Sequence, residues 1–451
     1  RLRLPLLLPL PLLLPSRPLL PLRLPLPLNT EEASSAAENP PPTLPLPVPP
    51  APLTFSLDPV PNRGHPRSRS LTSAPYTMRS FLSSLLLVPS LFVVNTLSAQ
   101  VVLQPPPAVQ VPPPVERCGF DALHQQLMQS DPAYRDRTLA FDAAARAQGG
   151  SFTRSLSTYK IPVVVHVMET GTGLTVLTDG QIRNAIKALN QRFRKVAGTA
   201  GFGSGVDVGI EFVLAVRDPN GNCTTGITRT NMTGNATYMA SGVFRQSVGI
   251  TDAALKALDV WDQTRYYNIW AVSEIDGNDG GSGIQGFAYF ASSHGTSLDG
   301  CVMLANQMAD PTSTVLTHEI GHALDVYHTF EGDVNGTACP NNSPCGTQGD
   351  QVCDTPPHIR SASDCNTSGT NGCDANSSNS LFVVNYMDYS SSDCQSMFSS
   401  GQAARMTLAL TTARASFLAA NGNTALVPPG DVDALADTVA RIGPLVQEVH
   451  A

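Results

Sequence analysis

Two histidines one helical turn apart constrain this 451-residue chain more than any other feature. His318 and His322 are four positions apart, so on an α-helix their imidazoles project from the same face. Two neutral imidazoles in this arrangement bind one Zn²⁺, and Glu319 beside them is suited to take a proton from water. Asp310 is expected to cap this helix and Pro311 to occupy its first position. The segment therefore predicts a helix that holds a metal ion.

A third histidine follows the pair. His328 lies six residues beyond His322, which is too far to reach the same metal if the helix continues. We therefore expect the chain to turn sharply near Asp325 and bring the third imidazole back. The alternative is an ordinary amphipathic helix that happens to carry histidines, but a third histidine at a suitable offset favours a zinc site.

Composition restricts the compartment and the partners. The net charge of -8 argues against nucleic acid as a partner and indicates a soluble, acidic protein. Nine cysteines, all but one of them after residue 220, are too many for a typical cytosolic enzyme. They indicate disulfides formed in an oxidising compartment.

The N-terminal hundred residues differ from the rest of the chain. Residues 1–77 repeat Leu and Pro, and arginines and prolines interrupt any membrane span, so we expect disordered low-complexity sequence. Residues 78–99 begin at the first methionine and resemble a secretory signal, with a basic start, an apolar run and a Leu-Ser-Ala end. The hypothesis is that translation begins at Met78, that residues 1–77 are not part of the natural product, and that the protein is secreted.

The globular part alternates apolar runs with helical periodicity, which predicts an α/β layer capped by the zinc helix. The expected strands are residues 161–168, 206–216, 267–273 and 286–290. The expected helices are residues 120–147, 179–196 and 401–420. An extended substrate is expected along the edge strand near residues 286–293. Residues 331–380 are rich in Gly, Asn, Ser, Asp and Cys, so they need cross-links or ions to become ordered.

Two further motifs accompany the histidines. The segment Asn-Tyr-Met-Asp-Tyr ends at Tyr389, and Arg-Cys-Gly, with its cysteine at Cys118, precedes the globular part. Together with the zinc motif, they make residues 118–417 resemble the pappalysin family of metzincin zinc metallopeptidases, in particular its small secreted microbial members. The resemblance implies an α/β (α+β) fold. Its N-terminal subdomain would hold a twisted mixed sheet and the active-site helix, and its C-terminal subdomain would be irregular and stapled by disulfides.

The resemblance also assigns roles to residues. It makes the three histidines the zinc ligands and the intervening glutamate the general base: His318, His322, His328 and Glu319. Met387 matches the Met-turn methionine that packs beneath the metal, and Tyr389 matches a tyrosine that contacts zinc or the reaction's oxyanion. For both residues the alternative is an ordinary apolar turn.

Two positions bear on latency and on the turn. Cys118 matches a pro-region cysteine whose sulfur binds zinc in the latent precursor and excludes water; the alternative is a free or intermolecular cysteine. Asp325 stands where the family pattern has glycine. Aspartate reaches the left-handed region at a cost on the order of 1 kcal/mol, so we expect a positive φ at Asp325.

The other eight cysteines are expected to form disulfides. The resemblance implies Cys365 with Cys394 and Cys339 with Cys373, around the Met-turn. Cys345 and Cys353 are close enough in sequence to close a small loop, which leaves Cys223 with Cys301 by elimination.

Two further sites are implied by the resemblance. Residues 349–356 resemble the family's calcium-binding loop, with a carboxylate from Asp350 and main-chain oxygens from Val352 and Thr355. One family ligand is missing there, so an acidic turn without metal is the alternative. Asp393 is expected in the wall of the substrate pocket, where a carboxylate favours Arg or Lys after the scissile bond; the alternative is a solvated loop aspartate.

These observations predict a secreted zinc metalloendopeptidase made as a latent precursor and acting as a monomer on protein or peptide substrates. Its parts would be a pro-region of residues 100–154, a catalytic domain of residues 155–422 and a tail of residues 423–451, with maturation near Arg154. The alternative is a secreted zinc-containing binding or adhesion protein whose catalysis is impaired by Asp325.

Overall fold

The computed structural model describes residues 116–150, 152–153, 158–171, 177–244, 249–418 and 421–428. The expected low-complexity segment, the signal sequence, the maturation site at Arg154 and the tail beyond residue 428 lie outside these residues.

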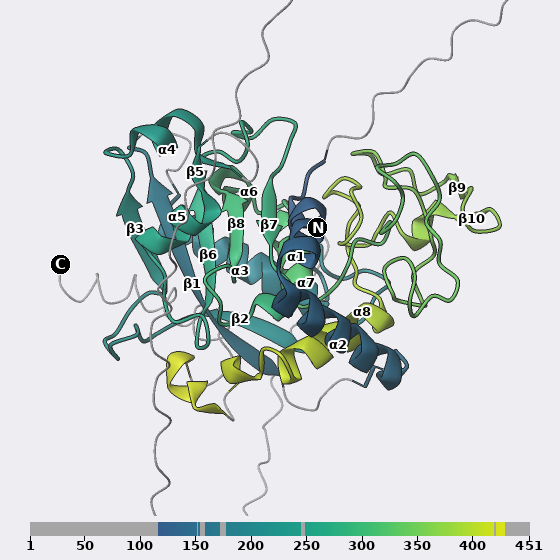
Figure 1. The fold of residues 1–451 in the computed structure, drawn as a ribbon, viewed down its shortest axis with the longest axis horizontal. Coiled ribbons are helices and arrows are strands. Elements are labelled where there is room, and N and C mark those ends of the chain that lie inside the picture. The colour runs from purple at the N-terminus through teal and green to yellow at the C-terminus, as the bar shows by residue number, and fades with distance from the viewer. Residues whose placement is uncertain are drawn as a thin grey trace, which may run out of the picture. The chain divides into compact units, whose positions relative to one another are not determined.

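A mixed β-sheet is the frame of the described chain (Figure 1). Its strands are β1 (Tyr159–Glu169), β2 (Ile210–Leu214), β3 (Ile227–Asn231), β6 (Tyr267–Val272), β7 (Gly286–Ala288) and β8 (Cys301–Leu304). The order is β2-β1-β6-β8-β7, with β3 also paired to β1. All these pairs are parallel except β7 with β8, so an antiparallel strand forms one edge. The expected mixed sheet is confirmed.

Helices bury one face of the sheet. The helix α3 (Asp179–Phe193) begins with a capping box between Thr178 and Gln181, and its apolar stripe packs on β1 and β6. The helix α7 (Val315–Ala323) carries the histidine pair and joins the same core through Leu316 and Ile320. The remaining helices and short strands are α4 (Ala236–Ser241), β4 (Val243–Phe244), β5 (Ile250–Thr251), α5 (Asp252–Leu258), α6 (Ala305–Ala309) and α8 (Ser400–Thr411).

Several expected boundaries need correction. The first helical stretch is divided into α1 (Phe120–Ser130) and α2 (Pro132–Gln148), because Pro132 lacks an N–H to continue α1 and instead opens α2. Asp310 does not cap α7: its carboxylate accepts the backbone N–H of Thr312 in a turn of its own, and α7 starts after Thr314. The strands β3 and β8 were not expected at all.

Disulfides hold the C-terminal region, where β9 (Thr370–Asn371) and β10 (Ser377–Ser378) are the only strands among the described residues. The expected pairs Cys339–Cys373, Cys345–Cys353 and Cys365–Cys394 are present. The pair Cys223–Cys301 is wrong. Cys301 is buried within β8 between β6 and β7, whereas Cys223 is exposed beside the backbone of Arg217.

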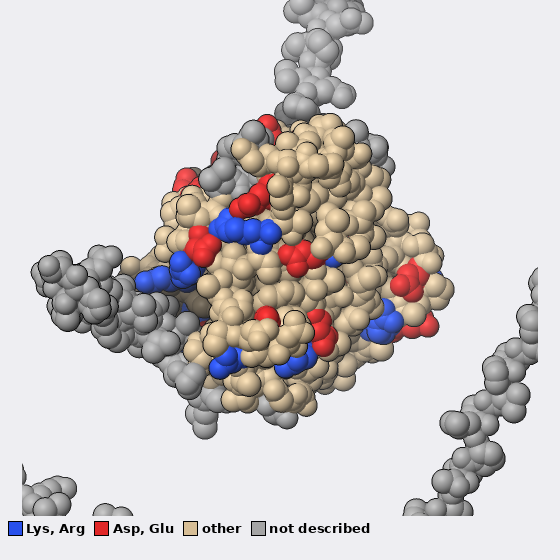
Figure 2. Space-filling view, turned by 90° about the vertical axis from the view of Figure 1, so that its left-hand side faces the viewer, with Lys and Arg blue, Asp and Glu red and all other residues tan. Residues whose placement is uncertain are grey.

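The outer surface carries charges of both signs. On the face shown in Figure 2, acidic and basic side chains lie close to one another across the described residues. No helix in the described part of the chain has both the length and the apolar character to span a membrane.

Candidate metal centre

Three imidazoles converge at the C-terminal end of α7. The Nε2 atoms of His318 and His328 are 3.1 Å apart, and that of His322 is 3.2 Å from each. Burial lowers the pKa of His318 to about 3, and burial likewise lowers the pKa of His322 well below its ordinary value. Both rings are therefore neutral at physiological pH, which is the form that binds a metal.

Each imidazole is oriented by an acceptor for its Nδ1–H. His318 donates to the carbonyl of Tyr386 at 2.7 Å, and His322 to the carbonyl of Val326 at 2.8 Å. The third ring, His328, lies 2.7 Å from a carboxylate oxygen of Asp121 in α1. These contacts leave all three Nε2 atoms free to face one point, as metal ligation requires.

The turn that returns His328 to the site occurs where expected. Asp325 has φ of 63°, in the left-handed region, and follows the last residues of α7. Its carboxylate accepts the backbone N–H of Ala291 at 3.1 Å, which helps to hold the side chain under the sheet edge. The expectation of a positive φ at Asp325 is confirmed.

Glu319 lies against β7 and faces the histidine cluster. It is 1 % exposed, and its Oε2 lies 3.4 Å from the sulfur of Cys118. A Cβ atom at Gly286 would come within 3.0 Å of the Glu319 side chain, so the glycine makes room for the carboxylate. Glu319 thus lies between the edge strand and the point that the imidazoles face.

Met387 packs beneath the histidine pair. A Cβ atom at Gly321 would collide with the Met387 sulfur, so the methionine sits directly against the backbone of α7. The backbone N–H of Met387 is held by the Asn385 side chain at 2.9 Å. This turn therefore forms the floor of the site.

Cys118 completes a set of four possible metal ligands. Its sulfur and the three imidazoles offer ligand atoms that all lie within 4.8 Å of one another, and all four residues are buried. Burial, together with the Glu319 carboxylate, raises the pKa of the Cys118 thiol well above its ordinary value. A bound metal cation would lower the pKa of this thiol and stabilise the thiolate. One sulfur and three imidazole nitrogens are a donor set that fits a tetrahedral transition metal.

The segment around Cys118 also occupies the edge of the sheet. Gly119 donates its N–H to the carbonyl of Gly286 at 2.9 Å, and Gln285 donates to the carbonyl of Arg117 at 2.8 Å. The hydroxyl of Tyr389 lies 3.2 Å from the backbone nitrogen of Cys118 and 3.3 Å from its carbonyl oxygen. The segment thus pairs with the backbone at the sheet edge and contacts the tyrosine that the sequence had singled out.

Known proteins are similar to this chain in sequence and fold. The family model described as pregnancy-associated plasma protein-A, peptidase family M43, matches residues 249–411, which include the histidine motif and the Met-turn. The resemblance of this chain to the pappalysin family of metallopeptidases is confirmed. An extracellular metalloprotease of Pyricularia oryzae is 28% identical over 302 residues, which cover 64% of this chain and 87% of that protein. An extracellular metalloprotease of Colletotrichum graminicola is 35% identical over 143 residues, 29% of this chain and 47% of that protein. The solved structure of a promirolysin mutant from Tannerella forsythia matches with a TM-score of 0.53 and 27% identity, over 70% of this chain and 100% of that one.

A cleft lies beside His318 and Glu319, and one side of its wall is formed by uncharged polar side chains. Thr314 and Ser392 are joined through their hydroxyls at 2.9 Å, and Gln395 bonds to Thr314 as well. Asp388 also lines the cleft; it is 1 % exposed, and its Oδ2 has no hydrogen-bond partner among the described residues.

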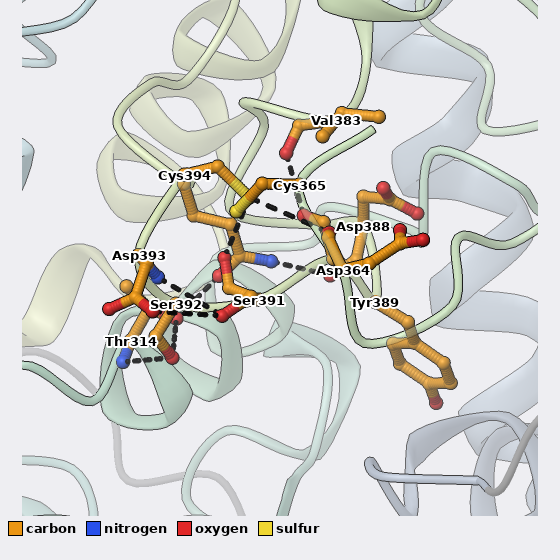
Figure 3. The surroundings of a disulfide bond; sticks show 12 residues. Thr314, Asp364, Cys365, Val383, Asp388, Tyr389, Ser391, Ser392, Asp393 and Cys394 are labelled. Atoms are coloured by element: carbon orange, nitrogen blue, oxygen red, sulfur yellow. Dashed lines mark hydrogen bonds between the residues drawn. A yellow bond between two sulfur atoms is a disulfide. The ribbon is translucent and has the colours of Figure 1, made fainter. Parts of the chain in front are cut away.

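The expected position of Asp393 needs correction. Asp393 is exposed and is not among the residues that line the cleft. Figure 3 shows it beside Ser391 and Ser392, away from the ring of Tyr389. Ser392 is the neighbour that reaches the cleft, where its hydroxyl accepts the backbone N–H of Thr314 at 3.2 Å.

The loop of residues 349–356 satisfies its own acidic group. The two carboxylate oxygens of Asp350 accept the N–H of Val352 at 3.0 Å and the hydroxyl of Thr355 at 2.6 Å. Burial raises the pKa of Asp350 to about 7, and both of its carboxylate oxygens already accept hydrogen bonds within the loop. The structure therefore does not support the calcium site.

Sequence reasoning missed three residues of this centre: Asp121, Gly286 and Asp388. Asp121 contacts a histidine 207 positions away, and nothing in its local sequence marks that contact. Asp388 lies within the Met-turn motif, directly after Met387, and this position could have indicated that it lies near the metal centre.

Proposed function

We propose that the chain is a secreted zinc metalloendopeptidase that hydrolyses peptide bonds in proteins and acts as a monomer. The observation that carries this proposal is the convergence of three imidazole nitrogens within 3.2 Å of one another beside the buried carboxylate of Glu319. Three histidines and one open position are the ligand set of catalytic zinc sites.

The residues that would hold zinc are His318, His322 and His328. Zinc there supplies Lewis-acid chemistry, which polarises a scissile carbonyl and makes water more acidic. Glu319 would accept a proton from the attacking water at its Oε atoms and pass it to the leaving amine. The Tyr389 hydroxyl would donate a hydrogen bond to the carbonyl oxygen as negative charge develops on it.

The substrate would bind as an added strand on β7. In the described structure, Gly119 and Arg117 use the carbonyl of Gly286 and the N–H of Gln285. Released from these contacts, the same backbone groups are available to an extended peptide, whose scissile bond would then lie near Glu319.

Latency would follow from the same contacts. Residues 100–154 would form a pro-region, residues 155–422 the catalytic domain, and cleavage near Arg154 would permit release. The sulfur of Cys118, 3.4 Å from Glu319, would be the fourth zinc ligand of the precursor and would exclude water. The similarity to a protein named promirolysin supports this division.

Secretion is supported by the three disulfides and by relatives named extracellular metalloproteases. The proposal includes removal of residues 78–99 as a signal sequence and a start at Met78. It assigns no role to residues 423–451.

A preference for Arg or Lys after the scissile bond would depend on Asp388 and not on Asp393, which was the residue expected from the sequence. Arg117 of the pro-region lies in the cleft and donates to the carbonyls of Tyr389 and Ser390 at 3.1 and 3.2 Å. Burial lowers the pKa of Arg117, and Tyr389 and the nearby Asp388 carboxylate oppose this shift. Once Arg117 has left the cleft, a basic side chain of the substrate would bind the same carbonyls of Tyr389 and Ser390.

The test of the proposal is hydrolysis of casein by the processed protein and by its Glu319→Gln variant. Removing a general base lowers rates by about 10²- to 10⁴-fold, whereas zinc content should be unchanged. Casein hydrolysis that survives this substitution, or a processed protein that binds zinc without hydrolysing casein, would contradict the proposal. The second result would favour the alternative of a zinc-containing binding protein. That alternative assumes that Asp325 impairs catalysis, but Asp325 does not prevent His328 from approaching His318.

The test of latency is Cys118→Ala in the unprocessed chain. The precursor should then hydrolyse a short peptide before cleavage, because water can reach the position that the sulfur occupied. Cys223→Ala is the matched control, since that cysteine is free and exposed. Equal activity of the Cys118→Ala precursor and the wild-type precursor would remove the latency proposal.

A further inference from the structure

The three candidate zinc ligands differ in where their orienting acceptors come from. His318 and His322 donate to backbone carbonyls of the catalytic domain, at 2.7 and 2.8 Å. His328 instead contacts a carboxylate oxygen of Asp121, at 2.7 Å. Asp121 lies in the first turn of α1, three residues after Cys118, and so belongs to the proposed pro-region. Release of that region would take this acceptor away.

A histidine that binds a metal through one ring nitrogen almost always donates the N–H of the other to an acceptor. This acceptor fixes the tautomer and the ring orientation, and its loss typically weakens metal binding by about 10- to 100-fold. A processed enzyme that lacked any partner for His328 Nδ1 would therefore hold zinc less well than its precursor. The ring needs a replacement from the catalytic domain.

Glu331 is in position to be that replacement. A carboxylate oxygen of Glu331, the Asp121 carboxylate and an imidazole nitrogen of His328 all lie within 4.8 Å of one another. Glu331 is also fixed to the ligand through the backbone, because its N–H donates to the carbonyl of His328 at 3.0 Å. Glu331 follows His328 by three residues and stays with the catalytic domain when α1 leaves.

The other groups packed on this ring do not compete for the role. The ring of Phe330 stacks on His328 at 4.6 Å between centroids, Phe120 meets it edge-on, and neither has a hydrogen-bond acceptor. Tyr389 also meets the ring edge-on, at 5.1 Å, but its hydroxyl bonds to the backbone of Cys118 instead. The nearby Asp333 is held by Arg360 through bonds of 2.7 and 2.8 Å to its two oxygens.

We propose that Asp121 and Glu331 are alternative positioning residues for the third zinc ligand. Asp121 orients His328 in the precursor, and Glu331 takes over the same Nδ1–H after the pro-region is released. The inference rests on the proposed zinc site and on release of the pro-region, and it adds that processing exchanges one carboxylate for another behind the metal.

The experiment measures the zinc dissociation constant of the precursor and of the processed enzyme by competition with a fluorescent chelator. The precursor is the full chain carrying Glu319→Ala, which prevents self-cleavage. The processed form is obtained from the full chain by a trace of active wild-type enzyme, followed by removal of the released segment.

The two substitutions should have opposite patterns. Asp121→Ala is expected to raise the zinc dissociation constant of the precursor by about 10- to 100-fold and to leave the processed form unchanged. Glu331→Ala is expected to leave the zinc dissociation constant of the precursor unchanged and to raise that of the processed form by a similar factor. Glu331→Gln should restore most of the affinity, because its amide oxygen still accepts the Nδ1–H. The exposed acids Asp136 and Asp279 provide matched Ala controls for the two parts of the chain.

Two results would overturn the inference. One is a processed Glu331→Ala enzyme with wild-type zinc affinity. The other is an equal loss in both forms that Glu331→Gln does not restore, which would mark a general structural role. If wild-type protein bound no zinc in either form, the proposed function itself would fall, so the two failures are distinguishable.

Discussion

Asp325→Asn is expected to remove a pH-dependent cost from the folded state. Asp325 is 1 % exposed, and burial raises its pKa to about 7 from an ordinary value of 3.8, although Arg405 and Arg414 oppose the shift. Because the folded pKa lies above the unfolded one, the unfolded chain loses this proton first as pH rises. The free energy of unfolding therefore falls between about pH 4 and pH 7.

The size of this effect follows from the two pKa values. Each pKa unit corresponds to 1.36 kcal/mol, so the buried carboxylate costs about 4 kcal/mol once both states are ionised. About 2.5 kcal/mol of that cost develops between pH 5 and pH 8. Asparagine also tolerates the left-handed φ of 63° and can accept the Ala291 N–H, so it keeps the local geometry.

The assay is urea unfolding of wild type and variant at pH 5, 6, 7 and 8 with zinc at one fixed concentration. The stability of Asp325→Asn minus that of wild type should rise by about 2.5 kcal/mol across this range. Any constant cost of the amide cancels in the comparison of pH values. Asp136→Asn, at an exposed position of α2, is the control for loss of a surface carboxylate. A difference that stays flat from pH 5 to pH 8 would refute the reasoning.

Two other predictions concern the C-terminal region. Replacing Cys365 and Cys394 by Ala should lower the free energy of unfolding by about 3.5 kcal/mol, because the bond closes a loop with a sequence separation of 29; equal urea midpoints with and without the disulfide would contradict this. Asp388→Asn should lower the ratio of kcat/KM for Ala-Arg over Ala-Leu peptides at least about tenfold, since a buried carboxylate is the stronger partner for a cation. Asp393→Asn should leave that ratio unchanged, because Asp393 is exposed outside the cleft, and a larger effect at Asp393 than at Asp388 would reverse the assignment.

The metal centre was predictable where its geometry is local. The spacing of His318 and His322 fixes two rings on one face of a helix, and the left-handed turn at Asp325 follows from the need to return His328. The apolar runs that became β1 and β6 were equally clear, because central parallel strands are buried on both faces.

The remainder depended on contacts between distant segments. The strand β8 is four residues long and is buried between β6 and β7, so no alternation marked it in the sequence. Aspartate is a common helix cap, so Asp310 was a reasonable candidate. In the structure its carboxylate instead accepts the N–H of Thr312 in a turn that precedes α7, which begins at Val315. The pairing of Cys223 with Cys301 was a guess by elimination, and elimination fails when cysteines remain unpaired.

The proposed pro-region would contribute to the candidate site as well as cover it. Within α1 and the residues just before it, Cys118 supplies a sulfur and Asp121 orients a histidine. These short contacts depend on α2 as well, because Asp142 forms an ion pair of 2.8 Å with Arg405 of α8, and each side chain is 5 % exposed. Breaking such a buried pair by removing one partner costs about 3–5 kcal/mol, which is comparable to the stability of many whole domains. In the proposed precursor a sulfur–metal bond would therefore be only part of what maintains latency, because the ion pair between α2 and Arg405 would also oppose release of the pro-region.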